Sequence, residues 1–358
     1  MSGIAMERRA FLAAAGAAWL AGLAPARAER LLHTDLLFAA AYRDPQGAYG
    51  VAIADEAGRI VSRHLLPGRG HGFAASRSSS WLVTFARRPG NFALALDKTG
   101  RREPVLFHTP EGRHFYGHGA MSGDGRLLLA AENDYHAGAG VIGLYDATNA
   151  FARIGEFPSH GVGPHEIVLM PDAKTLCVAN GGILTHPRHG RQKLNLPTMS
   201  PSIDFIDTTS GQLLSSHRLP QDLQRLSLRH MAVDARRAVW IGGQYQGDAL
   251  DTVPVLVRLD SGRGLEPVRL PGNAAAAFGP YVGSVAANRE ADVLAISSPR
   301  SGLILRLDTR SGALLSMTDH AGVCGLRDAG QDFVASSERG DFAGARHDLA
   351  WDNHIGAV

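Results

Sequence analysis

The sequence predicts an all-β protein, a seven-bladed β-propeller whose ring is closed by the C-terminal strand joining the N-terminal blade. The 42 Gly and 18 Pro residues suit a fold with many turns. One pattern, an apolar strand followed by Asp and a small polar turn, recurs at intervals of 42 to 61 residues, at Asp55, Asp97, Asp146, Asp207, Asp260 and Asp308. Asp accepts backbone N–H groups in such turns. Short strands at this repeat length are typical of propeller blades.

Residues 1–28 are interpreted as an export signal. Arg8-Arg9 precedes an apolar run over residues 10–24, and residues 26–28 fit the small-x-small rule for cleavage. The run is shorter than the roughly 20 residues of a membrane span, so we expect cleavage and no stable membrane insertion. A retained N-terminal anchor is the alternative. The arginine pair resembles a Tat signal, which predicts a periplasmic protein.

Composition excludes several classes of protein. The 36 basic and 34 acidic side chains give a formal charge of +2, and the +2 belongs to segment 1–28, which holds three Arg and one Glu. The remaining chain is formally neutral, which argues against a nucleic-acid partner that needs a broad basic surface. With two cysteines only, Cys177 and Cys324, a disulfide scaffold and a thiolate zinc cluster are excluded.

Residues 29–358 are expected to form a single propeller domain. Alignment of the repeats predicts six innermost strands, which open at His71, His118, His165, His230, Ser284 and Cys324. Segment 35–70 has three strands and no opening strand, and the C-terminal strand at His354 supplies it. Closure of this kind removes free strand edges. Because stretch 324–353 is short, a six-bladed ring is the alternative.

The inner strands suggest a metal site. Inner strands of a propeller begin near its axis, so five imidazoles should converge there: His71, His118, His165, His230 and His354. Cys324 opens a sixth strand and is a candidate additional ligand. Neutral imidazole binds transition metals, and we expect iron or copper. Two other interpretations stay open: structural hydrogen bonding, as in the Gly-His pairs of WD-type propellers, and anion binding by protonated histidines.

Polar residues in the loops after the second strands are expected to orient the ligands or to contact a substrate. They are Glu132, Asn133, Asn180, Gln244, Arg300 and Glu338. A long segment, 181–201, is expected to form a lid, because loops of this length are usually functional. Its polar side chains are His186, His189, Arg191 and Lys193. Strand alternation should point Glu166 away from His165, which makes Glu166 a weak candidate for a general base.

Several motifs support a family resemblance. They are RRAFL at 8–12, GHG at 117–119, GPHE at 163–166, the segment from ANGGI to KLNL at 179–196, and WDNH at 351–354. The chain resembles an uncharacterised bacterial family, a domain of unknown function, of Tat-exported YVTN-type β-propellers. Members are often encoded beside imelysin-type iron-regulated proteins and a di-haem-peroxidase-like protein. The resemblance implies metal handling, iron uptake above all, with these proteins as candidate partners.

Three functions follow as hypotheses. The first is a periplasmic propeller that binds a transition metal or metal complex at its axial His-rich face. The second is an enzyme in the same pocket, either a lactonase-like hydrolase or a metal oxidoreductase. The third is a non-catalytic protein-interaction scaffold. Ring nitrogens close to one common point would favour ligation. We also expect acidification from pH 7.5 to about 5.5 to protonate the imidazoles and to weaken metal binding.

Overall fold

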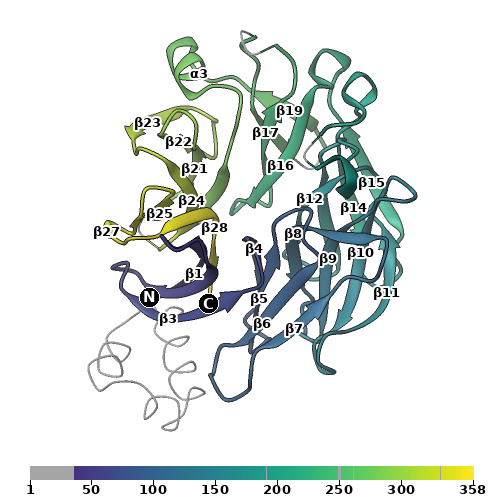
Figure 1. Ribbon diagram of the computed structural model, residues 1–358. Helices are drawn as coiled ribbons and strands as arrows, with labels where there is room; N and C mark the ends of the chain where they lie inside the picture. Colours follow the sequence, from purple (N-terminus) through teal and green to yellow (C-terminus); the bar gives the residue numbers. More distant parts are fainter. Residues whose placement is uncertain (1–35, 191, 249–250, 261, 331) are drawn as a thin grey trace.

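The computed structural model describes residues 36–358 except 191, 249–250, 261 and 331. Within these residues the strands form seven four-stranded sheets, arranged around a central axis (Figure 1). The prediction of an all-β, seven-bladed propeller is therefore confirmed. The predicted export signal, 1–28, lies outside the described residues.

Each blade runs outward from the axis, and the blades are numbered here in chain order. Blade one contains β28 (Ala350–Ala357), β1 (Leu37–Arg43), β2 (Tyr49–Asp55) and β3 (Ile60–Leu66). Blade two contains β4 (Gly70–Ala75), β5 (Trp81–Ala86), β6 (Phe92–Asp97) and β7 (Val105–His108). Blade three contains β8 (Arg113–Met121), β9 (Leu127–Asp134), β10 (Ala139–Asp146) and β11 (Ala152–Pro158).

The remaining blades follow the same order. Blade four contains β12 (Pro164–Leu169), β13 (Thr175–Asn180), β14 (Ser202–Asp207) and β15 (Leu213–Arg218). Blade five contains β16 (Leu226–Val233), β17 (Val239–Tyr245), β18 (Leu256–Asp260) and β19 (Gly264–Val268). Blade six contains β20 (Ser284–Asn288), β21 (Val293–Ser298), β22 (Leu303–Asp308) and β23 (Leu314–Asp319). Blade seven contains β24 (Val323–Asp328), β25 (Phe333–Ser337), β26 (Asp341–Phe342) and β27 (Ala345–Arg346).

The C-terminal strand closes the ring. β1 pairs with β2 on one side and with β28 on the other, so that Ala39 lies opposite both Ile53 and Gly356. β28 also contacts the inner strands β24 and β4 of the two adjacent blades. The two ends of the propeller therefore meet in one blade (Figure 1), and the predicted closure is confirmed. Blade seven is irregular, as expected from its length, because its two outer strands have two residues each.

The turn residues act as the repeats predict. Asp207 accepts the backbone N–H groups of Thr209 and Ser210 at 3.0 and 2.8 Å, and Asp308 accepts those of Arg310 and Ser311 at 3.1 and 2.8 Å. Each carboxylate satisfies donors that would otherwise lack a partner at the end of a hairpin. These turns set the strand spacing and therefore the blade repeat.

Helical structure is sparse in the described residues. It comprises α3 (Gly272–Phe278) and three 3₁₀ turns, η1 (Pro187–His189), η2 (Leu196–Thr198) and η3 (Gln221–Leu223). α3 was not expected, because seven residues are too few for a periodic apolar pattern. None of these described helices is long and apolar enough to cross a membrane.

The core lies between neighbouring blades. Trp240, Phe278 and Leu228 are fully buried in its largest cluster, and Phe107 stacks on Phe151 with ring centroids 4.9 Å apart. Because each sheet packs both faces against its neighbours, a central strand such as β5 is buried along its whole length, whereas the outer strands β11 and β15 alternate exposed and partly buried residues. This packing fixes the inner strands and the side chains that they bring to the axis.

Candidate metal centre at the propeller axis

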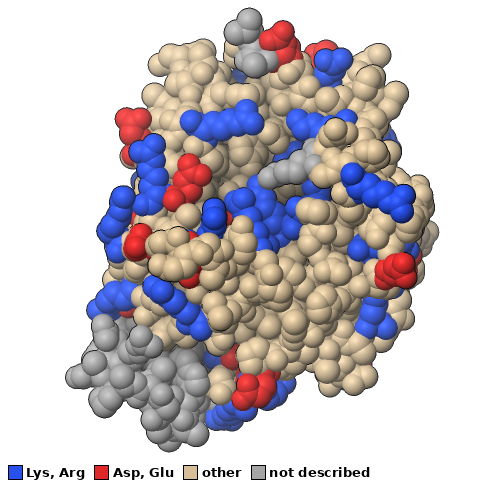
Figure 2. All heavy atoms as spheres, viewed as in Figure 1, with Lys and Arg blue, Asp and Glu red and all other residues tan. Residues whose placement is uncertain are grey.

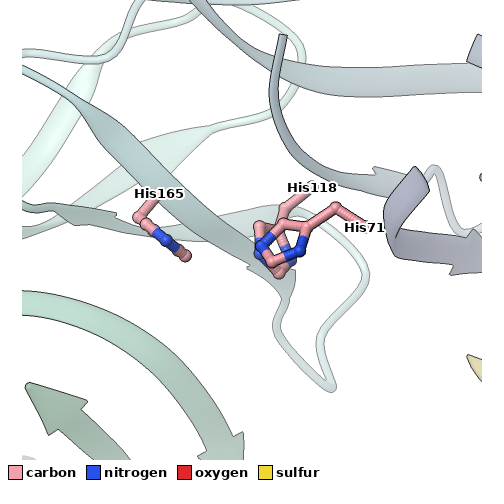
Figure 3. A group of neighbouring side chains, drawn as sticks. All are labelled: His71, His118 and His165. Carbon is pink, nitrogen blue, oxygen red and sulfur yellow. The ribbon is translucent and has the colours of Figure 1, made fainter. Parts of the chain in front are cut away.

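The five histidines that the repeats align come together on the axis. β4, β8, β12, β16 and β28 each carry one, in the order His71, His118, His165, His230 and His354. The ring centroid of His354 lies 4.5 Å from that of His71, 4.6 Å from His118 and 4.7 Å from His230. His165 lies 4.8 Å from His230 and 5.0 Å from His118. Figure 3 shows the rings of His71, His118 and His165 directed toward one another.

The spacing of the ring nitrogens is suited to a metal ion. Two groups of three offer ligand atoms within 4.8 Å of one another, namely His71, His118 and His165, and His118, His230 and His354. Three such atoms all lie within about 2.8 Å of a common point, while metal–imidazole bonds measure about 2.0–2.1 Å. Small ring movements would therefore bring three nitrogens to bonding distance. His118 belongs to both groups.

Irregular strand pairing aims these side chains. The register shifts beside the histidine in all five inner strands that carry one: between Gly70 and Phe73, Phe115 and Gly119, Pro164 and Glu166, Leu228 and His230, and Trp351 and Ile355. A bulge of this kind leaves a residue out of the ladder and turns its side chain, and bulges are common beside functional sites. The repeated bulge explains why equivalent positions point inward.

Glycines allow the rings to approach so closely. A Cβ atom on Gly117 would lie 2.6 Å from Cδ2 of His71, and this residue has a φ of +104°. A Cβ atom on Gly72 would lie 2.4 Å from the carbonyl oxygen of Gly117 and 2.8 Å from Nδ1 of His118. The Gly-His-Gly motifs of β4 and β8 are therefore required by packing between the two histidines.

Several imidazole nitrogens are buried without a hydrogen-bond partner. Among the described residues, these atoms are Nε2 of His118, Nδ1 of His165, both ring nitrogens of His230, and Nε2 of His354. Buried polar atoms are nearly always hydrogen-bonded, and each one left unpaired costs about 1–3 kcal/mol. No hydrogen bond joins any of the five rings to described backbone atoms, which argues against the WD-type structural interpretation.

Burial keeps the imidazoles neutral. It lowers the pKa of His71 to about 4 and the pKa values of His118 and His230 to about 3. The pKa values of His165 and His354 also lie well below 6.5, because of burial first and of the neighbouring histidines second. Neutral imidazole is the form that binds metals. A ring of protonated histidines at neutral pH, the anion-binding interpretation, is disfavoured.

Asp352 orients the first of these rings. Its Oδ1 accepts a hydrogen bond from Nδ1 of His71 at 3.0 Å, while Arg69 and Arg87 contact the same carboxylate at 2.5 and 3.2 Å. Burial alone would raise the pKa of Asp352, but the bond from His71 and the two guanidinium groups hold it well below its usual range. A carboxylate on Nδ1 leaves Nε2 for a metal.

Glu166 lies against the histidines, although strand alternation predicted that it would point away. Its Oε2 is 3.5 Å from Nδ1 of His230 and accepts the backbone N–H of Met231 at 2.9 Å. Its Oε1 is 4.0 Å from Nδ1 of His118. The register shift in β12 overturns simple alternation. Burial raises the pKa of Glu166.

A small basic cavity opens above the histidines. Its volume is about 40 Å³, and it is lined by His71, Arg87, Arg88, Tyr116, His165, Arg229, His230 and Tyr281. Figure 2 shows basic side chains gathered in the middle of this face. Three of the five histidines are thus reached from one opening.

The comparisons identify a family. A family model matches residues 64–358, which is most of the chain. The chain belongs to that family, described as "Protein of unknown function (DUF1513)". No curated protein gives a significant match.

Solved structures share the fold. Hydrazine synthase of Kuenenia stuttgartiensis matches with a TM-score of 0.60 and 13% identity, over 88% of this chain and 93% of that chain. The RRP9 WD40 repeats match with 0.55 and 14%, over 84% and 87%. The Cps50 (Swd1) β-propeller domain of Myceliophteria thermophila matches with 0.55 and 13%, over 81% and 89%. At these identities the likeness shows the propeller fold alone.

Glu132 and Asn180, which were predicted to orient the metal ligands or to contact a substrate, face the interior of their blades and not the histidines. The hydroxyl of Tyr145 donates to Glu132 at 2.5 Å, and Arg153 contacts Glu132 at 3.0 Å. Asn180 donates to the carbonyl of Ser159 at 2.9 Å and to Asp204 at 2.7 Å. The physical reason is pleating, which turns these strand residues toward outer strands or neighbouring loops.

Asn133 and Cys324 are also outside both histidine groups. Nδ2 of Asn133 bonds to Nε2 of His114 and to the carbonyl of Thr185, each at 3.0 Å, so it anchors the start of the predicted lid. The thiol of Cys324 donates to the carbonyl of Gly322 at 3.3 Å. Burial raises its pKa to about 12, which disfavours the thiolate that a metal needs.

Three further residues predicted to orient the ligands or to contact a substrate lie at the surface or in the backbone pairing of strands: Gln244, Arg300 and Glu338. Gln244 forms a backbone bridge with Tyr281, which lines the cavity. Arg300 and Glu338 are exposed, and Glu338 borders a separate hollow of about 250 Å³ that Cys324 and Asp352 also line.

The segment 181–201 divides between the opening and blade three. Lys193 is exposed but lies within electrostatic reach of Arg229, Arg300 and Arg88, and partial desolvation together with these charges lowers its pKa. His186 packs instead against Tyr135, with ring centroids 5.1 Å apart, and His189 lies 5.8 Å from His186. Arg191 lies outside the described residues.

Proposed function

We propose that this protein binds a transition metal ion, or a small metal complex, with the histidines on its axis. The observation that carries the proposal is the set of buried, unpartnered imidazole nitrogens within two groups of suitable spacing. Neutral imidazoles favour copper, zinc, nickel or ferrous iron, and iron or copper remain our candidates. Asp352 and Glu166 would hold the rings of His71 and His230 in the ligating orientation.

The proposal includes a cellular role. The Arg8-Arg9 pair and the apolar run that follows support export by the Tat pathway to the periplasm. The family resemblance supports a part in iron or other metal handling. Imelysin-type and di-haem-peroxidase-like proteins are the proposed partners, on the basis of that resemblance alone.

Metal analysis of the untagged mature chain tests the proposal. We expect about one equivalent of copper, or of ferrous iron loaded without oxygen, to remain bound after desalting. His118→Asn combined with His165→Asn should abolish retention, because both groups lose a ligand. His108→Asn, at an exposed position of β7, is the matched control. Less than about 0.1 equivalent in the wild type, unchanged in the double variant, would contradict the proposal.

A second candidate function is catalysis in the same pocket. It is favoured by Glu166, a carboxylate whose pKa is raised by burial and which lies beside two imidazoles, because a positioned carboxylate can accept and donate a proton. Lactone hydrolysis by the metal-loaded chain is the direct assay. Loss of lactone hydrolysis in Glu166→Gln, with metal retention intact, would support catalysis. Equal rates of hydrolysis in the wild type and in Glu166→Gln would rule out this role for Glu166.

A further inference from the structure

We propose that the opening above the histidines is an anion site, through which the metal arrives as a complex with a small di- or tricarboxylate. The cavity lining combines Arg87, Arg88 and Arg229 with three of the histidines and two tyrosines. No Asp or Glu is among the described residues that line it. The identity of the metal rests on the proposed function above, whereas the anion site rests on this lining.

A second group of cations surrounds the first. Lys193 comes from the segment 181–201 and Arg300 follows β21, and both are exposed. They lie close enough to Arg88 and Arg229 for these charges to act on Lys193. The basic side chains in the middle of the face in Figure 2 agree with this arrangement.

Asp352 and Glu166, the carboxylates that contact the histidines, lie beside the cavity and not in its lining. Asp352 contacts Arg87, but it also contacts Arg69 and His71. Glu166 adjoins His118 and His230. Neither of these two carboxylates lines the cavity, whose described lining is basic, imidazole and phenolic.

This charge distribution selects the form in which a metal enters. Charge-lined clefts change association rates by about 10- to 1000-fold, so a free hydrated cation is repelled where an anionic complex is attracted. Guanidinium groups bind carboxylates through paired hydrogen bonds. A cavity of about 40 Å³ admits one carboxylate group beside the histidines, with the rest of the chelator held outside by Lys193 and Arg300.

Equilibrium titration separates the anion site from the metal site. The probes are citrate alone, copper(II) alone in a non-coordinating buffer, and the copper–citrate complex. Arg88→Gln with Arg229→Gln should weaken the binding of citrate and of copper–citrate at least tenfold. The same variant should not weaken the affinity for free copper, because loss of two positive charges reduces the repulsion of a cation. Lys193→Gln with Arg300→Gln is a second variant at exposed positions, for use if the first fails to fold. Arg126→Gln, at an exposed turn, is the control.

The two proposals fail differently. His118→Asn with His354→Asn, two histidines that do not line the cavity, should lose copper and keep citrate. If the wild-type chain binds citrate but no copper, the proposed metal function is wrong and the anion site is supported. If the wild type binds copper, but the arginine variant binds citrate with the same affinity as the wild type, the anion site is overturned. The association rate of copper–citrate should also fall as ionic strength rises, and a rate that increases with salt would contradict it.

Discussion

At the scale of single residues, burial decides the chemistry of the histidines. His71 and His118 are each 4% exposed and His230 is 1% exposed, so their charged forms are disfavoured. The sequence alone predicts that these imidazoles titrate near neutral pH. The lowered pKa values correct that expectation, and metal affinity should stay nearly constant between pH 7.5 and 5.5.

The same pKa shifts predict how the metal-free chain responds to acid. An unfolded histidine has a pKa of about 6.5, whereas the buried ones have values near 3 to 4. Between these values the unfolded chain binds more protons, so the free energy of unfolding must fall as pH falls from 6.5 toward 4. We expect a loss of about 2 kcal/mol or more by pH 4.5, measured by urea unfolding without metal.

The control is the variant His118→Asn with His230→Asn, in which this loss should be smaller because two of the responsible groups are absent. Equal loss in the variant and the wild type would show that other groups cause it.

At the scale of the element, bulges in the inner strands carry the site. The alignment of the repeats located these strands and their histidines, although β8, β16 and β28 begin four or five residues before the histidine and not at it. A side chain's direction depends in addition on the local register. Glu166 therefore reaches the histidines, while Glu132 reaches Tyr145. Asp352 was not predicted, although it belongs to the WDNH motif at 351–354. Candidates were sought only among the inner-strand histidines and in the loops, whereas Asp352 lies two residues before His354 in the same strand.

A glycine substitution tests the packing of β8 against β4. Gly117→Ala places a methyl group 2.6 Å from Cδ2 of His71 at a φ of +104°, and such backbone strain costs about 1–3 kcal/mol. We expect that loss in urea unfolding, together with weaker copper retention.

Gly155→Ala is its matched control. Gly155 lies in outer strand β11, where the nearest atom to an added Cβ is 3.7 Å away, so we expect a change within about 0.5 kcal/mol and normal retention of copper. If the two variants behaved alike, close approach at Gly117 would not be the cause.

At the scale of the whole molecule, stability depends on closure by β28. This strand is the inner strand of blade one and also carries Asp352 and His354. Deletion of residues 350–358 exposes the edge of β1 and opens the ring. We expect loss of cooperative thermal unfolding and a tendency to aggregate, measured by near-ultraviolet circular dichroism and light scattering.

His354→Asn separates the strand from its side chain. This variant keeps the pairing between β28 and β1, so it should unfold cooperatively while retaining less copper. A deleted chain whose melting temperature matched that of the full chain would show that closure contributes little.

The amino-acid sequence was enough to predict the closure and the five axial histidines, because repeats are local patterns and equivalent positions in a ring converge. It predicted seven blades with six as the alternative, and the structure decided for seven. Only the tertiary structure decided which polar groups adjoin those histidines. These groups come from segments far apart in the chain, as Asp352, Arg87, Arg229 and Lys193 show. The bulge that turns Glu166 inward likewise depends on pairing between strands. The pKa values likewise follow from burial, which exists only once the blades have packed.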